Sequence, residues 1–339
     1  MTTLLVASGG GHLKQLVELA PRLRGVDQDF LWVTWRSAQS ESLLAGRDTV
    51  FVRPTRPRDP VGVSRNLDHA VKLVGRRDVT AVVTTGSQIV LPFLLVGRML
   101  NKPCHFIESA ARSTGPSLSA RMSRYLPGMH LYSQYHAWAD DRWIYVGSVF
   151  DGFESVPLEA TDTSPQPLKV VVTLGTMPRW HFRPLVEACV RVIPEGSRVL
   201  WQTGCTDVRG LAIEGREEVP AHELEAATAA ADVVISHAGV GSALTALRCG
   251  KRPILVPREA RRGEHVDDHQ RQIATELAGR NLALLRTPET LSTDDLVEAR
   301  RARIVIPQSL PPIQLASKRP PSSSRAGTRR AAAADRTNV

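Results

Sequence analysis

A short apolar segment, a turn of small residues and a helix-like segment follow one another between Asp232 and Gly250. We expect residues 232–236 to form a buried strand, residues 237–242 (His-Ala-Gly-Val-Gly-Ser) the turn, and residues 243–248 a helix that ends at Gly250. Such a turn leaves unpaired backbone N–H groups pointing at one place, and the helix dipole adds partial positive charge there. The turn therefore predicts a site for a phosphate or diphosphate group.

A polar cluster follows one strand and one loop later in the chain. It consists of His265, Asp267, Asp268, His269 and Gln270. Side chains of these types can donate hydrogen bonds to sugar hydroxyl groups and accept hydrogen bonds from them. The turn and the cluster together predict a nucleotide-sugar site.

Short apolar segments alternate with amphipathic segments along most of the chain. This alternation is typical of parallel sheets that are covered by helices on both faces. The expected strands are residues 3–7, 30–34, 50–52, 80–84, 105–107, 130–132, 169–174, 199–202, 233–236 and 253–256. The expected helices are residues 13–23, 63–74, 89–100, 117–125, 182–192, 222–230, 244–247 and 265–277. We therefore predict an α/β protein with two doubly wound, Rossmann-like parallel sheets.

The chain has 339 residues, which is too long for one ordinary core and comfortable for two domains. The segment 151–167 is rich in Pro, Thr, Ser, Asp and Glu and interrupts the alternation, so we expect an interdomain linker there. This gives an N-terminal domain at residues 1–150 and a C-terminal domain at residues 168–316. Residues 317–339 are rich in Pro, Ser, Ala and Arg and are expected to form a disordered basic tail.

Composition favours a soluble protein of a reducing compartment. Four cysteines, at 104, 189, 205 and 249, lack the paired spacing of a zinc site or a disulfide framework. The first residues have no basic segment and no long apolar segment, so no signal peptide is expected. Residues 79–97 carry no formal charge, but the polar run 84–88 and Pro92 interrupt them, so no membrane span is expected either. We predict a cytoplasmic protein.

The formal net charge is +9, and the basic residues are concentrated in the tail and in the first half. Basic surfaces attract nucleic acids, anionic membranes and phosphorylated substrates alike. Aromatic residues make up only 5%, and the chain has no nucleic-acid-binding motif, so no nucleic-acid partner is predicted. A solvated basic surface without a partner remains the alternative interpretation.

Two doubly wound domains place the carboxyl ends of both sheets across a cleft, where ligands of such folds bind. That architecture resembles the GT-B glycosyltransferases. The segments 8–12 (Ser-Gly-Gly-Gly-His), 85–87 (Thr-Gly-Ser) and 106–112 resemble the membrane-associated acceptor subunit of the eukaryotic two-subunit UDP-N-acetylglucosamine transferase of N-glycan assembly. The segments 172–176, 201–204, 236–242 and 268–270 are similar to its catalytic subunit. Bacterial relatives make exopolysaccharides, some of them as fused chains, and the lipid II synthase MurG is a more distant relative.

The resemblance covers residues 3–285 and implies a donor site on the C-terminal domain. Backbone N–H groups of Gly239, Val240, Gly241 and Ser242 would hold the diphosphate, and the Ser242 hydroxyl would add a donor. Gly175 and Thr176 would close over the phosphates from the first loop of that domain. His269 and Gln270 would meet the sugar hydroxyls. A tight turn without a ligand remains the alternative for the glycines.

Five further residues have two open interpretations each. Gln202 either contacts the donor or satisfies the end of the sheet. Arg258 either pairs with a phosphate or forms a surface salt bridge with Glu259 or Glu264. His237 is either structural or contacts the nucleotide. Glu264 and Asp268 either cap a helix or bind ligand. Thr245 stands where the relatives carry a glutamate for the ribose, and a hydroxyl cannot accept two hydrogen bonds as a carboxylate does.

The resemblance also implies the chemistry: a base deprotonates the acceptor hydroxyl, and the diphosphate departs from the opposite face with inversion. His12 is the first candidate base, with helix capping or phosphate binding as its alternatives, and Glu108 is the second. The acceptor side would include Gly10, Gly11, Thr85, Gly86, Ser87 and Ser109. The helix start at residues 239–242 can stabilise the leaving group, and no Asp-x-Asp motif is present, so no metal or other cofactor is expected.

The acceptor of related enzymes is a polyprenyl-diphosphate sugar at the cytoplasmic membrane face. Residues 89–100 and the arginines Arg112, Arg121 and Arg124 could supply apolar and cationic contacts to such an anionic membrane. The alternative for residues 89–100 is a core-packed helix. Three rival functions remain open: a UDP-sugar epimerase of the same fold, a non-catalytic partner that recruits acceptor for another transferase, and, far less favoured, a dinucleotide-dependent oxidoreductase.

Overall fold

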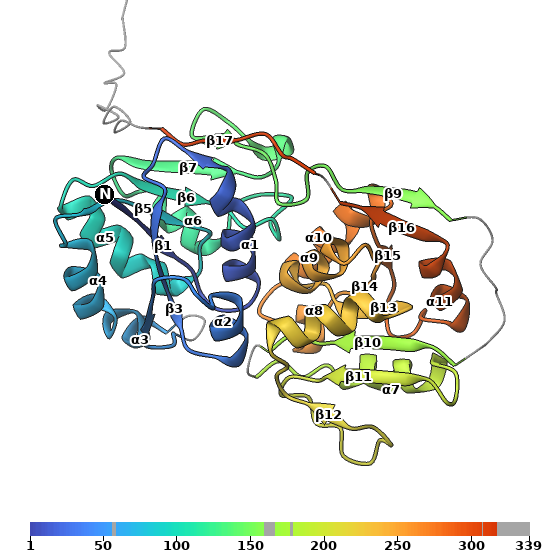
Figure 1. The fold of residues 1–339 in the computed structure, drawn as a ribbon. Coiled ribbons are helices and arrows are strands. Elements are labelled where there is room, and N and C mark those ends of the chain that lie inside the picture. Colours follow the sequence, from blue (N-terminus) through green and yellow to red (C-terminus); the bar gives the residue numbers. More distant parts are fainter. Residues whose placement is uncertain (56–58, 159–166, 177–178, 307, 317–339) are drawn as a thin grey trace, which may run out of the picture.

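The computed structural model describes residues 1–55, 59–158, 167–176, 179–306 and 308–316, and these form two parallel-sheet domains side by side (Figure 1). The N-terminal sheet has seven parallel strands in the order β4-β3-β1-β5-β6-β7-β8. Its strands are β1 (Thr2–Val6), β3 (Asp29–Trp35), β4 (Thr49–Val52), β5 (Val79–Thr84), β6 (Cys104–Ile107), β7 (Met129–Ser133) and β8 (Trp143–Tyr145). Its helices are α1 (Gly11–Leu19), α2 (Ala38–Leu43), α3 (Pro60–Ser64), α4 (Leu67–Val74), α5 (Leu91–Met99) and α6 (Leu118–Ser123).

The C-terminal sheet has six parallel strands in the order β12-β11-β10-β13-β14-β15. Its strands are β10 (Lys169–Thr173), β11 (Arg198–Gln202), β12 (Gly215–Arg216), β13 (Val233–His237), β14 (Ile254–Val256) and β15 (Leu284–Leu285). Its helices are α7 (Arg183–Val192), α8 (Ala221–Ala230), α9 (Val240–Arg248), α10 (His269–Gly279) and α11 (Thr293–Arg300). The structure thus confirms the predicted pair of doubly wound sheets. The strand orders change direction at β1 and at β10, which is where ligands of such folds bind.

Several element boundaries differ from the predictions for local reasons. The helix expected at residues 13–23 ends at Leu19, because Pro21 starts a 3₁₀ turn and the chain continues into β2 (Leu23–Arg24). The helix expected at 63–74 is broken at Asn66. The Asn66 side-chain amide accepts a hydrogen bond from the backbone N–H of Arg53 and donates one to its carbonyl. The helix expected at 265–277 starts only at His269, since residues 265–268 form a loop.

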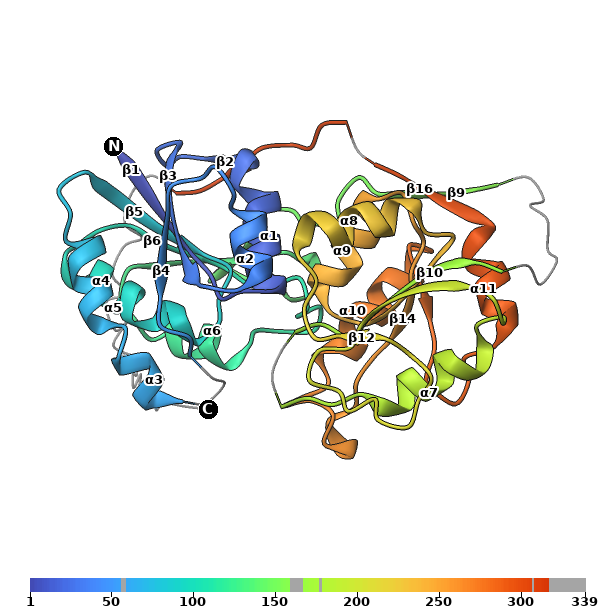
Figure 2. The same cartoon turned by 60° about the horizontal axis from the view of Figure 1, so that its bottom comes forward.

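The segment between the domains contains structure that its composition does not suggest. Glu154–Pro157 form strand β9, which pairs antiparallel with β16 (Ala302–Val305). Further along, β17 (Ile313–Gln314) pairs with β2 of the N-terminal domain, so the end of the described chain crosses back over the first domain (Figures 1 and 2). Residues 159–166 of the expected linker and the expected tail at 317–339 lie outside the described residues.

The two domains share one apolar interface around α1 and α9. Leu13 and Leu16 of α1 belong to the same buried cluster as Val240, Leu244 and Leu247 of α9. The two helices run parallel: Gly11 faces Gly241 at their first turns, and Glu18 pairs with Arg248 at their last turns. Both views place α1 opposite α9 between the sheets. This parallel packing brings two helix N-termini to one point at the domain boundary.

Within the described residues, no helix combines the length and the apolar character that crossing a bilayer requires.

Candidate active site

Two loops of the C-terminal domain meet at the carboxyl ends of the adjacent strands β10 and β13. His237, the last residue of β13, is wedged between them, with its Nδ1 3.2 Å from the carbonyl oxygen of Thr173. A Cβ atom added to Gly175 would lie 2.7 Å from His237 Cε1, and one added to Gly239 would lie 2.3 Å from its Nε2. Gly175 also has a φ of +72°, which side-chain-bearing residues rarely adopt. The imidazole therefore explains both glycines, and its contacts favour the structural interpretation of His237.

The helix start predicted to bind a diphosphate is present at α9. Gly239 precedes the helix in an extended conformation and provides no side-chain cap, so the first N–H groups of α9 have no partner from a capping side chain. The first turn of α1 lies directly against it, since a Cβ on Gly241 would be 3.2 Å from Gly11 Cα. Two parallel helices whose positive ends meet favour an anion at that point.

His12 lies in the first turn of α1 and comes next to the Thr85–Ser87 loop. Its Nδ1 is 2.8 Å from the carbonyl oxygen of Thr85, and the Thr85 hydroxyl donates to the carbonyl of His12 at 2.8 Å. A carbonyl can only accept, so Nδ1 carries the proton and Nε2 is the basic nitrogen. Burial, with help from the nearby His269 and Arg112, lowers the pKa of His12 to about 4. His12 is therefore a neutral, oriented base in the unliganded protein.

Glu108, the second predicted base, lies at the end of β6 and is only 1% exposed. One carboxylate oxygen accepts from the backbone N–H of Ser109 at 2.8 Å, and the other accepts from that of Ser117 at 2.7 Å. Burial raises its pKa, against these hydrogen bonds. Both oxygens hold the loop 109–117, so the contacts favour a supporting role for Glu108 and leave His12 as the better-placed base.

That loop carries Arg112 across the domain boundary. Arg112 Nη2 donates to Asp267 Oδ2 at 2.7 Å, and the other oxygen of Asp267 contacts His269 Nδ1. Although burial raises the pKa of Asp267, the hydrogen bonds from His269 and Arg112 lower it overall. Arg112 was predicted to contact a membrane, but in this structure it pairs with the loop that precedes α10. Its position after Glu108 is the sequence signal that could have indicated this role.

Arg258 and Gln270 connect the end of β14 to α10 and to the loop after β10. Arg258 is 2% exposed, so the predicted alternative of a surface salt bridge is wrong. Its Nη2 donates to the carbonyl of Leu174 at 2.8 Å, and its backbone N–H donates to Gln270 Oε1 at 3.0 Å. Burial lowers the pKa of Arg258 to about 10. Its guanidinium thus places a positive charge beside the loop that begins at Gly175.

Two predicted donor-binding side chains are engaged within the protein. The amide of Gln202 donates to Thr173 Oγ1 at 2.7 Å and accepts from the backbone of Val219 at 3.0 Å. These bonds favour the sheet-end interpretation of Gln202. The Thr245 hydroxyl donates to the carbonyl of Gly241 at 3.0 Å, one turn earlier in α9. A threonine hydroxyl that donates to its own helix in this way has no free donor for a ribose.

The two expected capping carboxylates also have partners. Glu264 Oε2 accepts from the backbone N–H of Glu259 at 2.9 Å, and Asp268 Oδ1 accepts from that of Ala260 at 2.8 Å. Both therefore tie down the loop 259–268 rather than the start of α10. Sequence reasoning missed Gln15, which is buried in α1 and bonds to Ser109 Oγ at 3.0 Å and to the backbone N–H of Ala110 at 2.8 Å.

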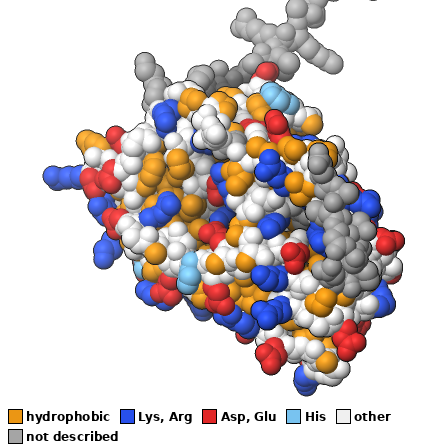
Figure 3. All heavy atoms as spheres, turned by 45° about the vertical axis from the view of Figure 1, so that its right-hand side comes forward, with side chains coloured by type: hydrophobic (Ala, Val, Ile, Leu, Met, Phe, Trp, Pro, Cys, Tyr) orange, Lys and Arg blue, Asp and Glu red, His pale blue; other side chains and the backbone are white. Residues whose placement is uncertain are grey.

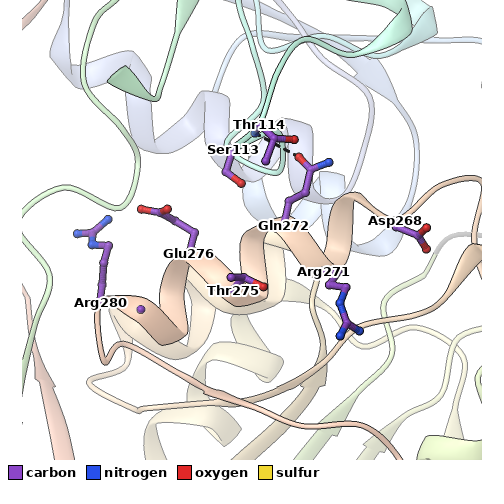
Figure 4. A pocket seen from close by; sticks show the side chains of 9 residues that line it. Ser113, Thr114, Asp268, Arg271, Gln272, Thr275, Glu276 and Arg280 are labelled. Carbon is purple, nitrogen blue, oxygen red and sulfur yellow. Dashed lines mark hydrogen bonds between the residues drawn. The ribbon is translucent and has the colours of Figure 1, made fainter. Parts of the chain in front are cut away.

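A groove of about 600 Å³ adjoins the site, between α10 and the segment Ser113–Thr114. Figure 4 shows Gln272 reaching from α10 toward Thr114, whose backbone N–H lies 3.4 Å from Gln272 Oε1. Glu276 and Arg280 lie further along the helix, and Asp268 and Arg271 lie at its beginning. The groove thus runs along α10 between the two domains, from Asp268 to Arg280.

Residues 169–300 match the glycosyltransferase family 28 C-terminal domain. The fold is GT-B. A structure of MurG from Acinetobacter baumannii aligns with a TM-score of 0.52 at 15% identity, over 88% of this chain and 89% of that one. The glycosyltransferase SnogD from Streptomyces nogalater gives 0.56 at 18% identity, over 88% and 90%. The spinosyn rhamnosyltransferase SpnG, complexed with thymidine diphosphate, gives 0.50 at 16% identity, over 88% and 90%.

No curated protein sequence matches the chain significantly. The domain match and the two-domain fold together support a glycosyltransferase.

Proposed function

We propose that this protein is an inverting glycosyltransferase that moves a sugar from a UDP-sugar to a polyprenyl-diphosphate-linked saccharide in surface polysaccharide synthesis. The sugar would be N-acetylglucosamine or another hexose or hexuronic unit. The observation that carries the proposal is the meeting of the N-termini of α1 and α9 at Gly11 and Gly241, beside the basic nitrogen of His12. That meeting point offers a diphosphate site and a proton acceptor within one boundary between domains.

The chemistry follows from these positions. The acceptor hydroxyl gives its proton to His12 Nε2 while its oxygen forms a bond to the anomeric carbon of the donor. The bond from that carbon to the diphosphate breaks, and the electron pair leaves with the nucleoside diphosphate. The N–H groups at the start of α9, with Arg258 below them, stabilise the departing charge, so we propose that this step needs no metal. Displacement from the opposite face converts an α-linked donor into a β-linked product.

Three findings support a nucleotide-sugar donor. The C-terminal half matches a glycosyltransferase domain, and its predicted phosphate loops lie side by side. One structure of similar fold was solved as a complex with thymidine diphosphate. The preference for UDP comes from the sequence resemblance to the eukaryotic two-subunit transferase and its fused bacterial relatives. Because Thr245 replaces the expected glutamate, the base and ribose preference is the part most worth measuring.

A lipid-linked acceptor is supported by an apolar face on α4, α5 and α6. The large apolar side chains that this face exposes are Leu67, Val71, Leu95, Met99, Leu100, Leu118, Met122 and Tyr125. Met99 is 74% exposed and Tyr125 is 84% exposed. The three helices adjoin: α4 packs on α5, and Arg98 of α5 bonds to the carbonyl of Pro127 just after α6. Most other apolar residues of α5 are buried, as the alternative of a core helix predicts for them.

Basic side chains lie around this apolar helix face, including Lys72, Arg121 and Arg124. Apolar side chains surrounded by cations suit the surface of an anionic membrane. By contrast, the face seen in Figure 3 intersperses Lys and Arg with Asp and Glu among its described residues. We propose that the apolar helix face rests on the inner surface of the cytoplasmic membrane, with the acceptor entering from there.

The proposal is tested by measuring thermal unfolding with UDP-, GDP- and dTDP-linked sugars, followed by transfer assays with the preferred donor. A ligand that binds only the folded state raises the unfolding temperature by mass action. We expect UDP-sugars to give the largest shift and the purified chain to glycosylate a synthetic polyprenyl-diphosphate saccharide. Conversion of the donor to an isomer without acceptor would instead identify an epimerase. Donor binding with no turnover under either condition would identify a recruiting partner.

A further inference from the structure

We propose that His265, Asp267 and His269 form a binding site for a divalent transition-metal ion, and that an ion bound there excludes the donor sugar. The three residues lie within one five-residue segment, His-Val-Asp-Asp-His, that leads into α10. One ligand atom from each, two imidazole nitrogens and one carboxylate oxygen, lie within 4.8 Å of one another. The occupancy of the site is independent of the proposed transfer reaction, whereas its inhibitory effect rests on that proposal.

The geometry places all three ligand atoms on one side of the segment. His265 Nδ1 lies 3.9 Å from Asp267 Oδ1, and His269 Nδ1 contacts that same oxygen. An ion bonded at about 2.1 Å to nitrogen and oxygen ligands holds them about 3 to 3.5 Å apart. A small movement of His265 toward Asp267 Oδ1, and of His269 away from it, would bring the three atoms to these separations.

The second observation is the state of His265. It is only 7% exposed, and its Nδ1 has no hydrogen-bond partner among the described residues. A buried polar nitrogen without a partner is uncommon and calls for an explanation. This nitrogen faces Asp267, so a cation held between them would provide the missing partner. The ring of Trp180 stacks on the imidazole, with 5.5 Å between the two ring centroids, and this contact holds the imidazole in its orientation.

Neighbouring side chains orient the ligands as they do in metal sites. Arg112 holds the second oxygen of Asp267, Oδ2, so that Oδ1, which His269 contacts in this structure, is the oxygen that would face the ion. Outer partners of this kind fix the direction of a ligating carboxylate. Two imidazoles and one carboxylate match the preferences of Zn²⁺, Co²⁺ and Ni²⁺ rather than those of Mg²⁺ or Ca²⁺. The remaining coordination position would be open to water or to a ligand.

Such an ion would compete with the sugar. His269 is predicted to contact the sugar hydroxyls, and its imidazole would be committed to the metal. Zn²⁺ is therefore expected to weaken donor binding. In the proposed reaction no metal contacts the leaving diphosphate at α9.

The test uses the full-length protein, first treated with a chelator, and Co²⁺ as the probe. We expect bound Co²⁺ to give a visible absorption band typical of low coordination number. One equivalent of Zn²⁺ should displace the Co²⁺ and abolish the band, whereas Mg²⁺ should leave it unchanged. His269→Ala and Asp267→Asn should each weaken Co²⁺ binding more than about tenfold. The control His136→Ala removes an exposed histidine far along the chain and should bind as the wild type does. Circular dichroism and cooperative thermal unfolding verify that each variant is folded.

A wild-type protein that shows no Co²⁺ band and no Zn²⁺ heat in titration calorimetry would overturn the site, whatever its activity. Binding that persists unchanged in both ligand variants would do the same, because another part of the chain would then hold the ion. If the metal binds but the thermal shift by UDP-sugar is the same with and without Zn²⁺, the site stands and the exclusion of the donor is refuted. Failure of the proposed transferase activity would leave the metal titrations unaffected.

Discussion

Replacing Gly241 with valine tests the point at which the two domains and the proposed diphosphate meet. A single added Cβ would already lie 3.2 Å from Gly11 Cα, which is tighter than most real Cβ contacts, and 3.5 Å from Gly11 N. Valine adds two further methyl groups at this boundary between backbones. Overpacking of this kind costs about 1–3 kcal/mol. The shared apolar cluster and the Glu18–Arg248 ion pair hold the rest of α1 and α9 together. We therefore expect the added methyl groups to push the two N-termini apart.

The separation should remove the diphosphate site. At a ligand concentration of a hundred times Kd, binding stabilises a protein by about 2.7 kcal/mol, so the wild type should show a clear rise in unfolding temperature with UDP. We expect Gly241→Val to lower the unfolding temperature without ligand and to lose the UDP-induced rise. Gly279→Ala is the matched control, because no atom lies within 4 Å of its added Cβ. A valine variant that kept the full UDP-induced rise would refute the assignment of this helix start as the phosphate site.

Further expectations concern the base, its support and the membrane face. His12→Gln should lower kcat by about 10²–10⁴ while keeping the UDP-induced thermal shift, and a variant with wild-type turnover would remove His12 from the mechanism. Glu108→Gln should keep most of the wild-type turnover and reduce stability by about 1–3 kcal/mol in denaturant titrations, because one of the two backbone N–H groups loses its acceptor to an amide NH2 and the other keeps only a neutral acceptor. A loss of turnover as large as that of His12→Gln would favour Glu108 as the base. The pKa of His12 is about 4 in the folded protein and 6.5 in the unfolded chain, so the unfolded chain takes up the proton first as the pH falls. The free energy of unfolding should therefore decrease between pH 6.5 and 4. This decrease should be smaller in His12→Gln. Met99→Asp together with Met122→Asp should reduce sedimentation with anionic vesicles, whereas Val190→Asp on α7, also exposed, should not. Equal sedimentation of the two variants would contradict the membrane proposal.

Much of the architecture followed from local patterns. The alternation of apolar and amphipathic segments predicted both parallel sheets, because strands buried on two faces read as short apolar runs. The strand, turn and helix at residues 233–248 are present as expected, with Gly239 at the start of α9. Short pairings escaped prediction: β9 lies in a segment whose composition suggests a linker, and it exists because β16 supplies a partner from far along the chain.

The site itself separates into two kinds of residue. His12 and the glycine turns could be named from the chain, since turns at the ends of parallel strands collect ligands. The contacts that distinguish the roles of His12 and Glu108 could not be named. Both residues are polar and lie near strand ends, but only the folded structure shows Glu108 bonded to two backbone N–H groups and His12 held through Nδ1 at the carbonyl of Thr85.

By itself, the sequence determined the class of fold and the position of the strand, turn and helix around Gly239, because both depend on residue types at short spacing. Tertiary structure alone decided that α1 and α9 run parallel with touching first turns, that Arg112 reaches Asp267, and that Gln202 and Arg258 are buried supports. The physical reason is that these contacts either join residues 155 positions apart (Arg112 and Asp267) and 230 positions apart (Gly11 and Gly241) or depend on burial. Local sequence specifies neither which distant residues meet nor which side chains are removed from water.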